Sequence, residues 1–272
     1  MSVAADRHTW VPETARRPRS AIDVEGLALH YDGQAAFEDV SLSIETGGIT
    51  AIVGPSGCGK TSFLLSLNRL TDLVPRCRVT GRIRIGGDDI LAPRHDVVSL
   101  RRRVGMIFQK PNPFPFSIRR NLAFPLREHG VKDRDMIDAR IESALRDVGL
   151  WNEVRDRLDA AALDLSGGQQ QRVCLARALA LEPEVILLDE PCSALDPISS
   201  GVVEDLILRL RGRYTIVIVT HNLAQARRIV DDVAVFWVRD GAGRLIESGH
   251  ATDVFENPRS ALTRAYVTGR RG

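Results

Sequence analysis

Long hydrophobic runs are missing from this chain of 272 residues. No apolar stretch approaches the ~18 residues that a membrane-spanning helix requires, so we expect any action at a membrane to depend on a partner. The first residues contain arginines but no apolar segment of the kind that secretion signals have. We predict that residues 1–20 form a disordered tail.

Cysteine is scarce, and charge of one sign does not dominate. The four cysteines, at positions 58, 77, 174 and 192, show neither C-x-x-C pairing nor the histidine spacing of zinc sites, which favours reduced thiols in a cytoplasmic protein. The formal net charge is only +2, which is too small to indicate nucleic acid as the main partner. The proportions of hydrophobic and charged residues, 44% and 26%, are typical of a soluble globular protein.

Apolar patterning predicts two kinds of strand. Alternation over residues 22–45, with a turn at Asp32-Gly33, is typical of antiparallel strands, and residues 81–87 add another short strand. Other runs are almost continuously apolar, as expected for parallel strands that are covered on both faces. These runs are ITAIVG (49–54), VILLDE (185–190), TIVIVT (215–220) and VAVFWV (233–238).

Helical patterns separate the apolar runs and dominate from about residue 112 to residue 180. One helix in this part has an apolar face, with Asp133 as its predicted N-cap and Gly149 as its predicted C-cap. Strands that alternate with helices indicate a mostly parallel α/β sheet. The long helical stretch indicates an insertion into that α/β core.

The segment GPSGCGKT at residues 54–61 fits G-x-x-x-x-G-K-[ST] and stands between an apolar strand and a helical pattern. Glycines let backbone N–H groups converge on phosphates, Lys60 can reach the phosphates as a cation, and Thr61 can place its hydroxyl on Mg²⁺. The alternative is a glycine-rich turn that merely precedes a helix. The predicted nucleotide-binding residues are Gly54, Pro55, Ser56, Gly57, Cys58, Gly59, Lys60, Thr61 and Ser62.

We call residues 54–61 the phosphate cradle. With this cradle, the predicted fold is a P-loop NTPase core with a mostly parallel sheet, an N-terminal antiparallel β subdomain and a helical insertion. We assign residues 21–272 to one domain. Its core occupies residues 21–110 and 181–272, and its helical subdomain occupies about 111–180. Cys58, inside the cradle, is expected to have a lowered thiol pKa because it stands at a helix N-terminus, or else to be a small filler residue.

The apolar run VILLDE ends in two carboxylates. A strand that ends in this way can deliver Asp189 to the metal and Glu190 to an attacking water, for which Glu190 would act as general base. An acidic strand end is common by itself. Together with the phosphate cradle it indicates nucleotide hydrolysis.

The stretch LSGGQQQRVCLARALALEP at residues 165–183 predicts a helix that is opened by Ser166 and runs until Pro183. A hydroxyl group and free N–H groups at a helix N-terminus suit phosphate oxygens. An ordinary capped helix is the alternative.

LSGGQ, the cradle, VILLDE, SALD at 193–196 and a histidine after a strand at 221 together resemble the ATP-binding subunit of ABC transporters, over residues 22 to about 260. The resemblance implies a head-to-tail dimer with two ATP molecules between the cradle of one subunit and the LSGGQ segment of the other. A two-fold axis closes such contacts into a dimer. The implied LSGGQ contacts are Ser166, Gly167, Gly168 and Gln169.

The same resemblance implies roles for further residues. Tyr31 would stack on adenine, unless it is only an edge-strand aromatic. Gln109 would contact the metal and the water and sense the partner. Asp196 would lie in the loop that crosses the dimer, and His221 would contact the γ-phosphate and help to orient the water, unless it is structural. Cys192 stands where the family usually has threonine.

The segment QKPNPFPFSIRRN, from Gln109 to Asn121, resembles the phosphate-import branch of these subunits, as do SALDPIS, YTIVIVTHN and FENPRSALTRAYVTGRRG. Arg119 and Arg120 depart from the pattern of that branch. The resemblance implies two transmembrane permease subunits, an external phosphate-binding protein that acts through the permease, and a peripheral location on the cytoplasmic face of the inner membrane. It implies no nucleic-acid partner.

Prolines at alternate positions in this segment exclude helix and central strand. We hypothesise a stiff strip that passes motion from Gln109 to a surface where the permease docks. A simple loop spacer is the alternative.

Other functions remain as alternatives. The same kind of ATPase subunit could drive the import of another solute, such as polar amino acids. A soluble ABC-type ATPase of DNA repair, chromosome organisation or translation would need long coiled coils, zinc modules or a second ATPase half, none of which fits this chain. An interaction protein with a dead nucleotide site conflicts with the joint presence of Lys60, Asp189 and Glu190.

Overall fold

The computed structural model describes residues 20–270, so the predicted tail lies outside the described residues except for Ser20, which begins the first strand. All strands belong to one ten-stranded sheet with the order β5-β4-β1-β2-β10-β9-β3-β8-β7-β6. The strands are β1 (Ser20–Tyr31), β2 (Gln34–Glu45), β3 (Ile49–Val53), β4 (Cys77–Ile85), β5 (Asp88–Asp89), β6 (Val104–Ile107), β7 (Val185–Asp189), β8 (Thr215–Val219), β9 (Asp232–Arg239) and β10 (Ala242–His250).

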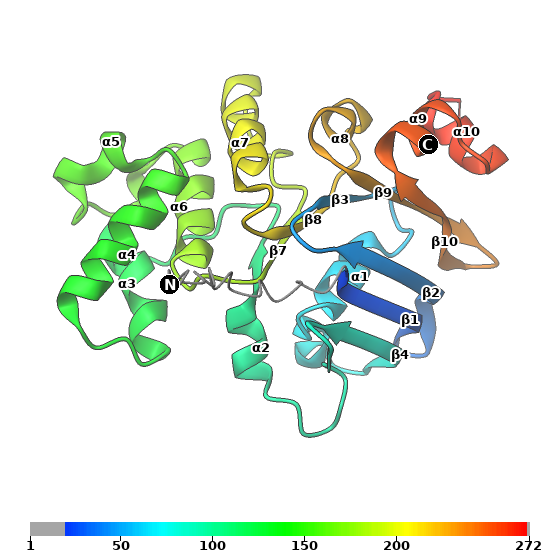
Figure 1. Ribbon diagram of the computed structural model, residues 1–272, viewed down its shortest axis with the longest axis horizontal. Helices are drawn as coiled ribbons and strands as arrows, with labels where there is room; N and C mark the ends of the chain where they lie inside the picture. The colour runs from blue at the N-terminus through cyan, green and yellow to red at the C-terminus, as the bar shows by residue number, and fades with distance from the viewer. Residues whose placement is uncertain (1–19, 271–272) are drawn as a thin grey trace, which may run out of the picture.

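Helices cover both faces and one end of this sheet (Figure 1). The α-helices are α1 (Lys60–Ser66), α2 (Val97–Arg103), α3 (Ile118–Glu128), α4 (Arg134–Asp147), α5 (Trp151–Val154), α6 (Gly167–Leu179), α7 (Pro197–Leu210), α8 (Leu223–Ile229), α9 (Ala251–Glu256) and α10 (Ala261–Val267). Short 3₁₀ helices are η1 (Leu70–Leu73), η2 (Arg155–Arg157) and η3 (Ala162–Asp164). Within residues 20–270, no helix combines the length and the apolar character needed to cross a bilayer.

The antiparallel part of the sheet forms as predicted. β1 pairs with β2 on one side and with β4 on the other, both antiparallel. Asp32 and Gly33 turn the β1–β2 hairpin with φ values of 49° and 82°. Two successive residues with positive φ match the right-handed twist of the flanking strands, which explains the choice of aspartate and glycine here.

The parallel part separates two hydrophobic cores. β3, β7 and β8 are buried along their whole length. β8 pairs parallel with β3 and β7, and β9 pairs parallel with β3, which confirms the four predicted parallel strands. Alternate side chains of β3 point to opposite faces, so Ala51 joins the core beneath α7 and α8, whereas Ile52 packs in the other core with Phe63 and Leu64 of α1. The central strands are therefore held from both sides.

Strand β10 was not predicted from the sequence, and it changes the architecture. β10 pairs antiparallel with β9 and touches β2 through the parallel pair Gly243–Phe37. This contact joins the antiparallel strands and the parallel strands into one sheet. Gly243 is required there, because a Cβ at this position would lie 2.2 Å from the carbonyl oxygen of Cys58.

The helical stretch forms a group at one end of the molecule, where α3, α4, α5 and α6 lie together (Figure 1). Asp133 caps α4 as predicted and accepts from the N–H of Met136. Gly149 lies one residue beyond the C-cap, Val148, and its φ of 64° supports the bonds that close the helix end, including Leu150 N–H to the Leu145 carbonyl.

One predicted helix is shorter than expected. α6 ends at Leu179 rather than running until Pro183, because Glu182 adopts a φ of 53°, which a right-handed helix does not allow. α1 ends at Ser66, and the chain continues into the separate turn η1.

We expect Gly243→Ala to lower the Tm by about 2–10 °C, since forcing a methyl group against backbone costs about 1–3 kcal/mol. ATP affinity should fall as well, because the displaced carbonyl belongs to the cradle. The matched control is Gly201→Ala in α7, where a Cβ meets nothing within 4 Å and a helical alanine stabilises. Thermal unfolding and ATP titration measure both effects; an unchanged Tm for Gly243→Ala would contradict the close approach.

Candidate active site

Four neighbouring parallel strands end at one edge of the sheet. Their order is β3-β8-β7-β6, so the segments that follow them lie side by side although they are far apart in the sequence. The cradle follows β3, and His221 follows β8. Asp189 ends β7, Glu190 comes directly after it, and Gln109 follows β6. Ligands of open α/β sheets bind at this carboxyl edge.

The cradle is a tight loop that is closed by the buried, cationic side chain of Lys60. The Nζ atom of Lys60 donates to the carbonyls of Gly54 and Pro55, each at 2.8 Å, and the side chain is buried. Gly59 has a φ of 87°, and a Cβ there would lie 2.8 Å from the Ala36 carbonyl oxygen. These contacts hold the loop closed around its own backbone.

A cavity of about 300 Å³ opens over the cradle. It is lined by Ala36, Ser56, Gly57, Gly59, Lys60, Thr61, Ser62 and Glu190. Gly57, with a φ of 80°, keeps that side of the cavity free of any Cβ. A lysine, several hydroxyl groups and glycine backbone are the chemistry that suits a polyphosphate, so the residues fit ATP.

Cys58 does not behave as expected. Its side chain is fully buried in the core, and burial raises the pKa of its thiol against the smaller opposing effect of Lys60. The predicted low pKa was therefore wrong. The filler alternative holds for its side chain, and only its backbone remains available to a nucleotide.

Thr61 and Asp189, two of the predicted metal ligands, lie within hydrogen-bond distance of each other. Thr61 Oγ1 donates to Asp189 Oδ1 at 3.1 Å, and Asp189 is 8% exposed. Burial raises the pKa of Asp189, the Thr61 hydrogen bond and Lys60 lower it, and Glu190 adds to the increase. A hydroxyl and a carboxylate fit Mg²⁺, which takes few protein ligands and completes its shell with phosphates and water. Residues 20–270 contain no cluster of three or more acidic, histidine or cysteine ligands.

Glu190 is held by two of the predicted residues. Gln109 Nε2 donates to Glu190 Oε2 at 3.3 Å, and His221 Nδ1 lies 3.1 Å from the same oxygen. Glu190 itself has a φ of 45°, and its N–H donates to the Val219 carbonyl of β8. A left-handed backbone at a non-glycine residue is strained, and such strain concentrates at functional positions.

Tyr31 lies beside the cradle. Its hydroxyl donates to Ser62 Oγ at 3.3 Å, so the end of β1 meets the start of α1. The ring is partly buried, and this location is compatible with the predicted stacking on adenine, which stays a prediction.

The LSGGQ residues lie apart from the cradle. Ser166 caps α6 in a capping box with Gln169, and α6 packs with α3 and α4 in the helical group at the left of Figure 1, whereas α1 lies near the middle of the picture. Gly168 faces Ser199 of α7, and Asp196 caps α7 through the N–H groups of Ile198 and Ser199. Within residues 20–270, the hydrogen bonds of Ser166 go to Gln169 and Gln170 of its own helix, and none joins it to the cradle.

Sequence reasoning missed some supports of the site. Tyr266 in α10 accepts a hydrogen bond from the Gly54 N–H at 3.1 Å, and Gly243 packs under Cys58. Gly243 belongs to no recognised motif, and Tyr266 lies in FENPRSALTRAYVTGRRG, a segment whose resemblance to the phosphate-import branch did not imply a contact with the cradle.

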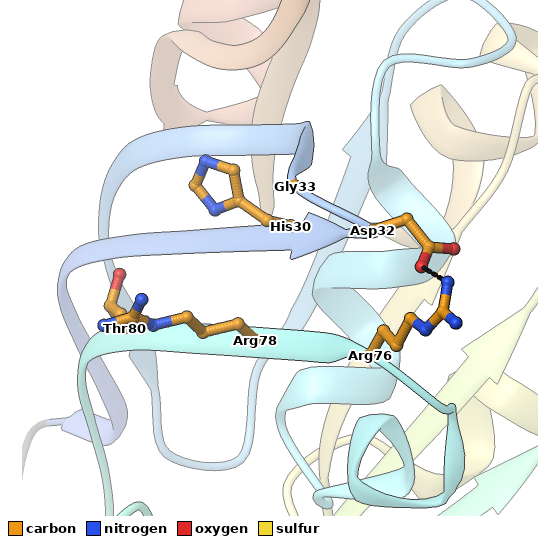
Figure 2. Close-up of a pocket in the computed structure, with 6 residues that line it drawn as sticks. All are labelled: His30, Asp32, Gly33, Arg76, Arg78 and Thr80. Atoms are coloured by element: carbon orange, nitrogen blue, oxygen red, sulfur yellow. Dashed lines mark hydrogen bonds and ion pairs between the residues drawn. The ribbon is translucent and has the colours of Figure 1, made fainter.

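A larger hollow, of about 730 Å³, is a separate feature beside β1 and β4 (Figure 2). It is lined by His30, Asp32, Gly33, Arg76, Arg78 and Thr80, and Arg76 pairs with Asp32 at 3.1 Å. None of the predicted site residues lines it.

Residues 37–193 match the ABC transporter family, and the chain belongs to that family. The predicted ABC ATPase fold is confirmed by the solved structure of cbiO1 from Clostridium perfringens, part of the ABC transporter complex cbiONQ. It matches with a TM-score of 0.75 and 29% identity, over 93% of this chain and 100% of that chain. A bacterial Atm1-family ABC exporter with ATP bound matches with a TM-score of 0.74 and 25% identity, over 93% of this chain and 42% of the exporter.

The predicted resemblance to the phosphate-import branch is also confirmed. The chain is 61% identical, over 255 residues, to the phosphate import ATP-binding protein PstB 1 of Nitrosococcus oceani. The alignment covers 94% of this chain and 92% of that relative. It is thus a PstB-like member of the ABC ATPases.

We expect Asp189→Asn to raise the Tm at pH 7 by about 2–4 °C, the shift that ~1 kcal/mol produces in a chain of this size, because it removes a buried charge but keeps an oxygen for Thr61. The folded chain binds the Asp189 proton more tightly than the unfolded chain does. The advantage of the variant therefore shrinks as the pH falls through the raised pKa and disappears below about 3.9.

Mg²⁺ and ATP should stabilise the parent far more than this variant, because Asp189 is the expected metal carboxylate. Unfolding curves at several pH values, with and without nucleotide, measure both effects. A variant that is less stable than the parent at pH 7 would show that the buried charge of Asp189 does not destabilise the folded chain.

Proposed function

We propose that this chain is the ATP-hydrolysing subunit of an ABC importer that takes up inorganic phosphate. The observation that carries the proposal is the 61% identity over 94% of the chain to a phosphate import ATP-binding protein. It is combined with the meeting of the cradle, Asp189, Glu190, Gln109 and His221 at one sheet edge. ATP and Mg²⁺ are the cofactors that this site would hold.

In the proposed reaction, the cradle backbone and Lys60 bind the phosphates, and Tyr31 stacks on adenine. Thr61 and Asp189 hold Mg²⁺, which supplies charge stabilisation when it is bound. Glu190 accepts the proton of the attacking water.

Gln109 and His221 keep the Glu190 carboxylate in place, and both would also reach the nucleotide: Gln109 the metal and the water, His221 the γ-phosphate. Their contacts with one carboxylate oxygen support this arrangement.

The second half of each site would come from a second copy of the chain. Ser166, Gly167, Gly168 and Gln169 of one subunit would face the γ-phosphate bound by the other, and Asp196 would cross the interface. The separation of α6 from the cradle within one chain supports this head-to-tail dimer (Figure 1). Hydrolysis would remove the group that joins the two copies.

The proposed docking surface for two transmembrane permease subunits is the aromatic cluster Phe114, Phe116 and Phe124, whose ring centroids lie 5.8–6.0 Å apart. Arg120 stacks on Phe116 and Arg177 on Phe114, which adds charge around an apolar patch.

The proline strip that carries this surface is well fixed. The residues from Gln109 to Phe116 form neither helix nor strand, as predicted. Buried Asn121 accepts from the Phe114 N–H at 2.7 Å and donates to the carbonyls of Phe114, Phe116 and Ser117. This anchoring supports the hypothesis that the strip passes motion from Gln109 to the docking surface, rather than serving as a loose spacer.

Through the permease, an external phosphate-binding protein would deliver the solute, and the subunit would lie on the cytoplasmic face of the inner membrane. No observation favours the polar amino acid importer or the soluble ATPase over this proposal. The former becomes an outcome of the following test.

The test is uptake of labelled phosphate, at low external concentration, by cells whose only copy of the chain carries Glu190→Gln. We expect uptake to fall by about tenfold or more while ATP binding persists, because only the general base is lost. Glu256→Gln, at an exposed carboxylate, is the matched control and should transport normally. Normal phosphate uptake with lost uptake of a labelled polar amino acid would replace the proposal with the alternative.

A further inference from the structure

Gln171, the third glutamine of the LSGGQQQ segment, turns inward. Successive helical residues are rotated by about 100°, so three adjacent glutamines cannot share a face. Gln169 donates to Glu153 at 2.8 Å, and Gln170 donates to the Leu165 carbonyl at 2.9 Å. Gln171 is only 2% exposed.

The amide of Gln171 joins α6 to two loops of the active site. Its Nε2 atom donates to the Phe108 carbonyl at 3.4 Å and to the Pro191 carbonyl at 3.2 Å. Phe108 immediately precedes Gln109, and Pro191 immediately follows Glu190. Because β6 and β7 are parallel neighbours, one side chain spans the loops at the ends of both.

Packing alone does not explain an amide at this position. The Oε1 atom of Gln171 is buried without a hydrogen-bond partner, which costs free energy that an aliphatic side chain would avoid. A void of about 10 Å³ borders Gln171 and Pro191 and is otherwise lined mainly by aliphatic side chains. No other side chain of residues 20–270 donates to either carbonyl. The two donated bonds are therefore the reason for a glutamine here.

We propose that Gln171 is a positioning residue for ATP hydrolysis, which fixes the loops of Gln109 and Glu190 to the helix that begins at Ser166. The contacts lie within one chain. Their consequence across the interface rests on the proposed dimer: a subunit that moves its Gln109 loop also moves the Ser166 that it presents to its partner's nucleotide.

The test compares Gln171→Met with Gln170→Met in the full-length chain. Methionine matches the length of glutamine but removes the donors together with the orphan acceptor. We expect Gln171→Met to lower kcat about tenfold while the KM and the Kd for ATP stay within about twofold, because the cradle is untouched. Gln170→Met should match the parent in all three quantities. Should Gln171→Met fail to fold, Gln171→Asn, whose amide falls one methylene short, carries the same expectation.

Hydrogen exchange gives a readout that does not depend on turnover. The amides that follow Phe108 and those that follow Pro191 should both exchange about tenfold faster in Gln171→Met, whereas the cradle amides should keep the parent's rate. In a double-mutant cycle, Gln171→Met with Gln109→Ala should lose little more kcat than the worse single variant, because both act on the same loop.

An unchanged kcat, faster exchange that also includes the cradle, or kcat losses that multiply in the cycle would each overturn the proposal. These outcomes are separate from failure of the proposed function. A chain that serves another solute fails the phosphate uptake test, but it still gives the kinetic and exchange results, because those need only the chain and ATP.

Discussion

The parallel pairing of β3, β8, β7 and β6 is the constraint on which the rest of this structure depends. It brings segments from four distant parts of the sequence to one edge of the sheet. Two hydrophobic cores, one on each face, hold these strands, and the close packing of Gly243 against Cys58 fixes the cradle above them. The contacts between Thr61 and Asp189, and those around Glu190, follow from that arrangement.

Two features of the active site lower the stability of the folded chain. Asp189 carries a charge in a buried place, which raises its pKa, and Glu190 adopts a left-handed backbone. Both features cost free energy in the isolated chain. In the proposed function, a bound metal ion and the phosphates of ATP would offset the first cost. This is the expected balance between stability and function at a site.

Much of the fold and of the site could be predicted from the sequence because it is encoded locally. The cradle spacing, the apolar runs and the Asp32-Gly33 turn each need only neighbouring residues. β10 was missed because its residues, from Ala242 to His250, have no clear apolar alternation, and only the pairing with β9 and β2 makes them a strand.

Properties that depend on tertiary packing could not be predicted in the same way. The Cys58 pKa was expected from its place at a helix N-terminus, but burial dominates over that effect. The hydrogen bonds from Gln171 to Phe108 and Pro191 join residues that are far apart in the sequence, so only the folded chain shows them. The roles of Tyr31, Asp196 and the LSGGQ residues toward ATP remain predictions.

The most direct test of the shared nucleotide site mixes two defective subunits, one with Lys60→Ala and the other with Ser166→Ala, both in the Glu190→Gln background that traps ATP. A head-to-tail dimer places both defects in one of its sites and leaves the other intact. We therefore predict that each variant alone traps no ATP, whereas their mixture traps one ATP per mixed dimer. A mixture that traps none, together with a single parent chain that encloses ATP by itself, would contradict the account.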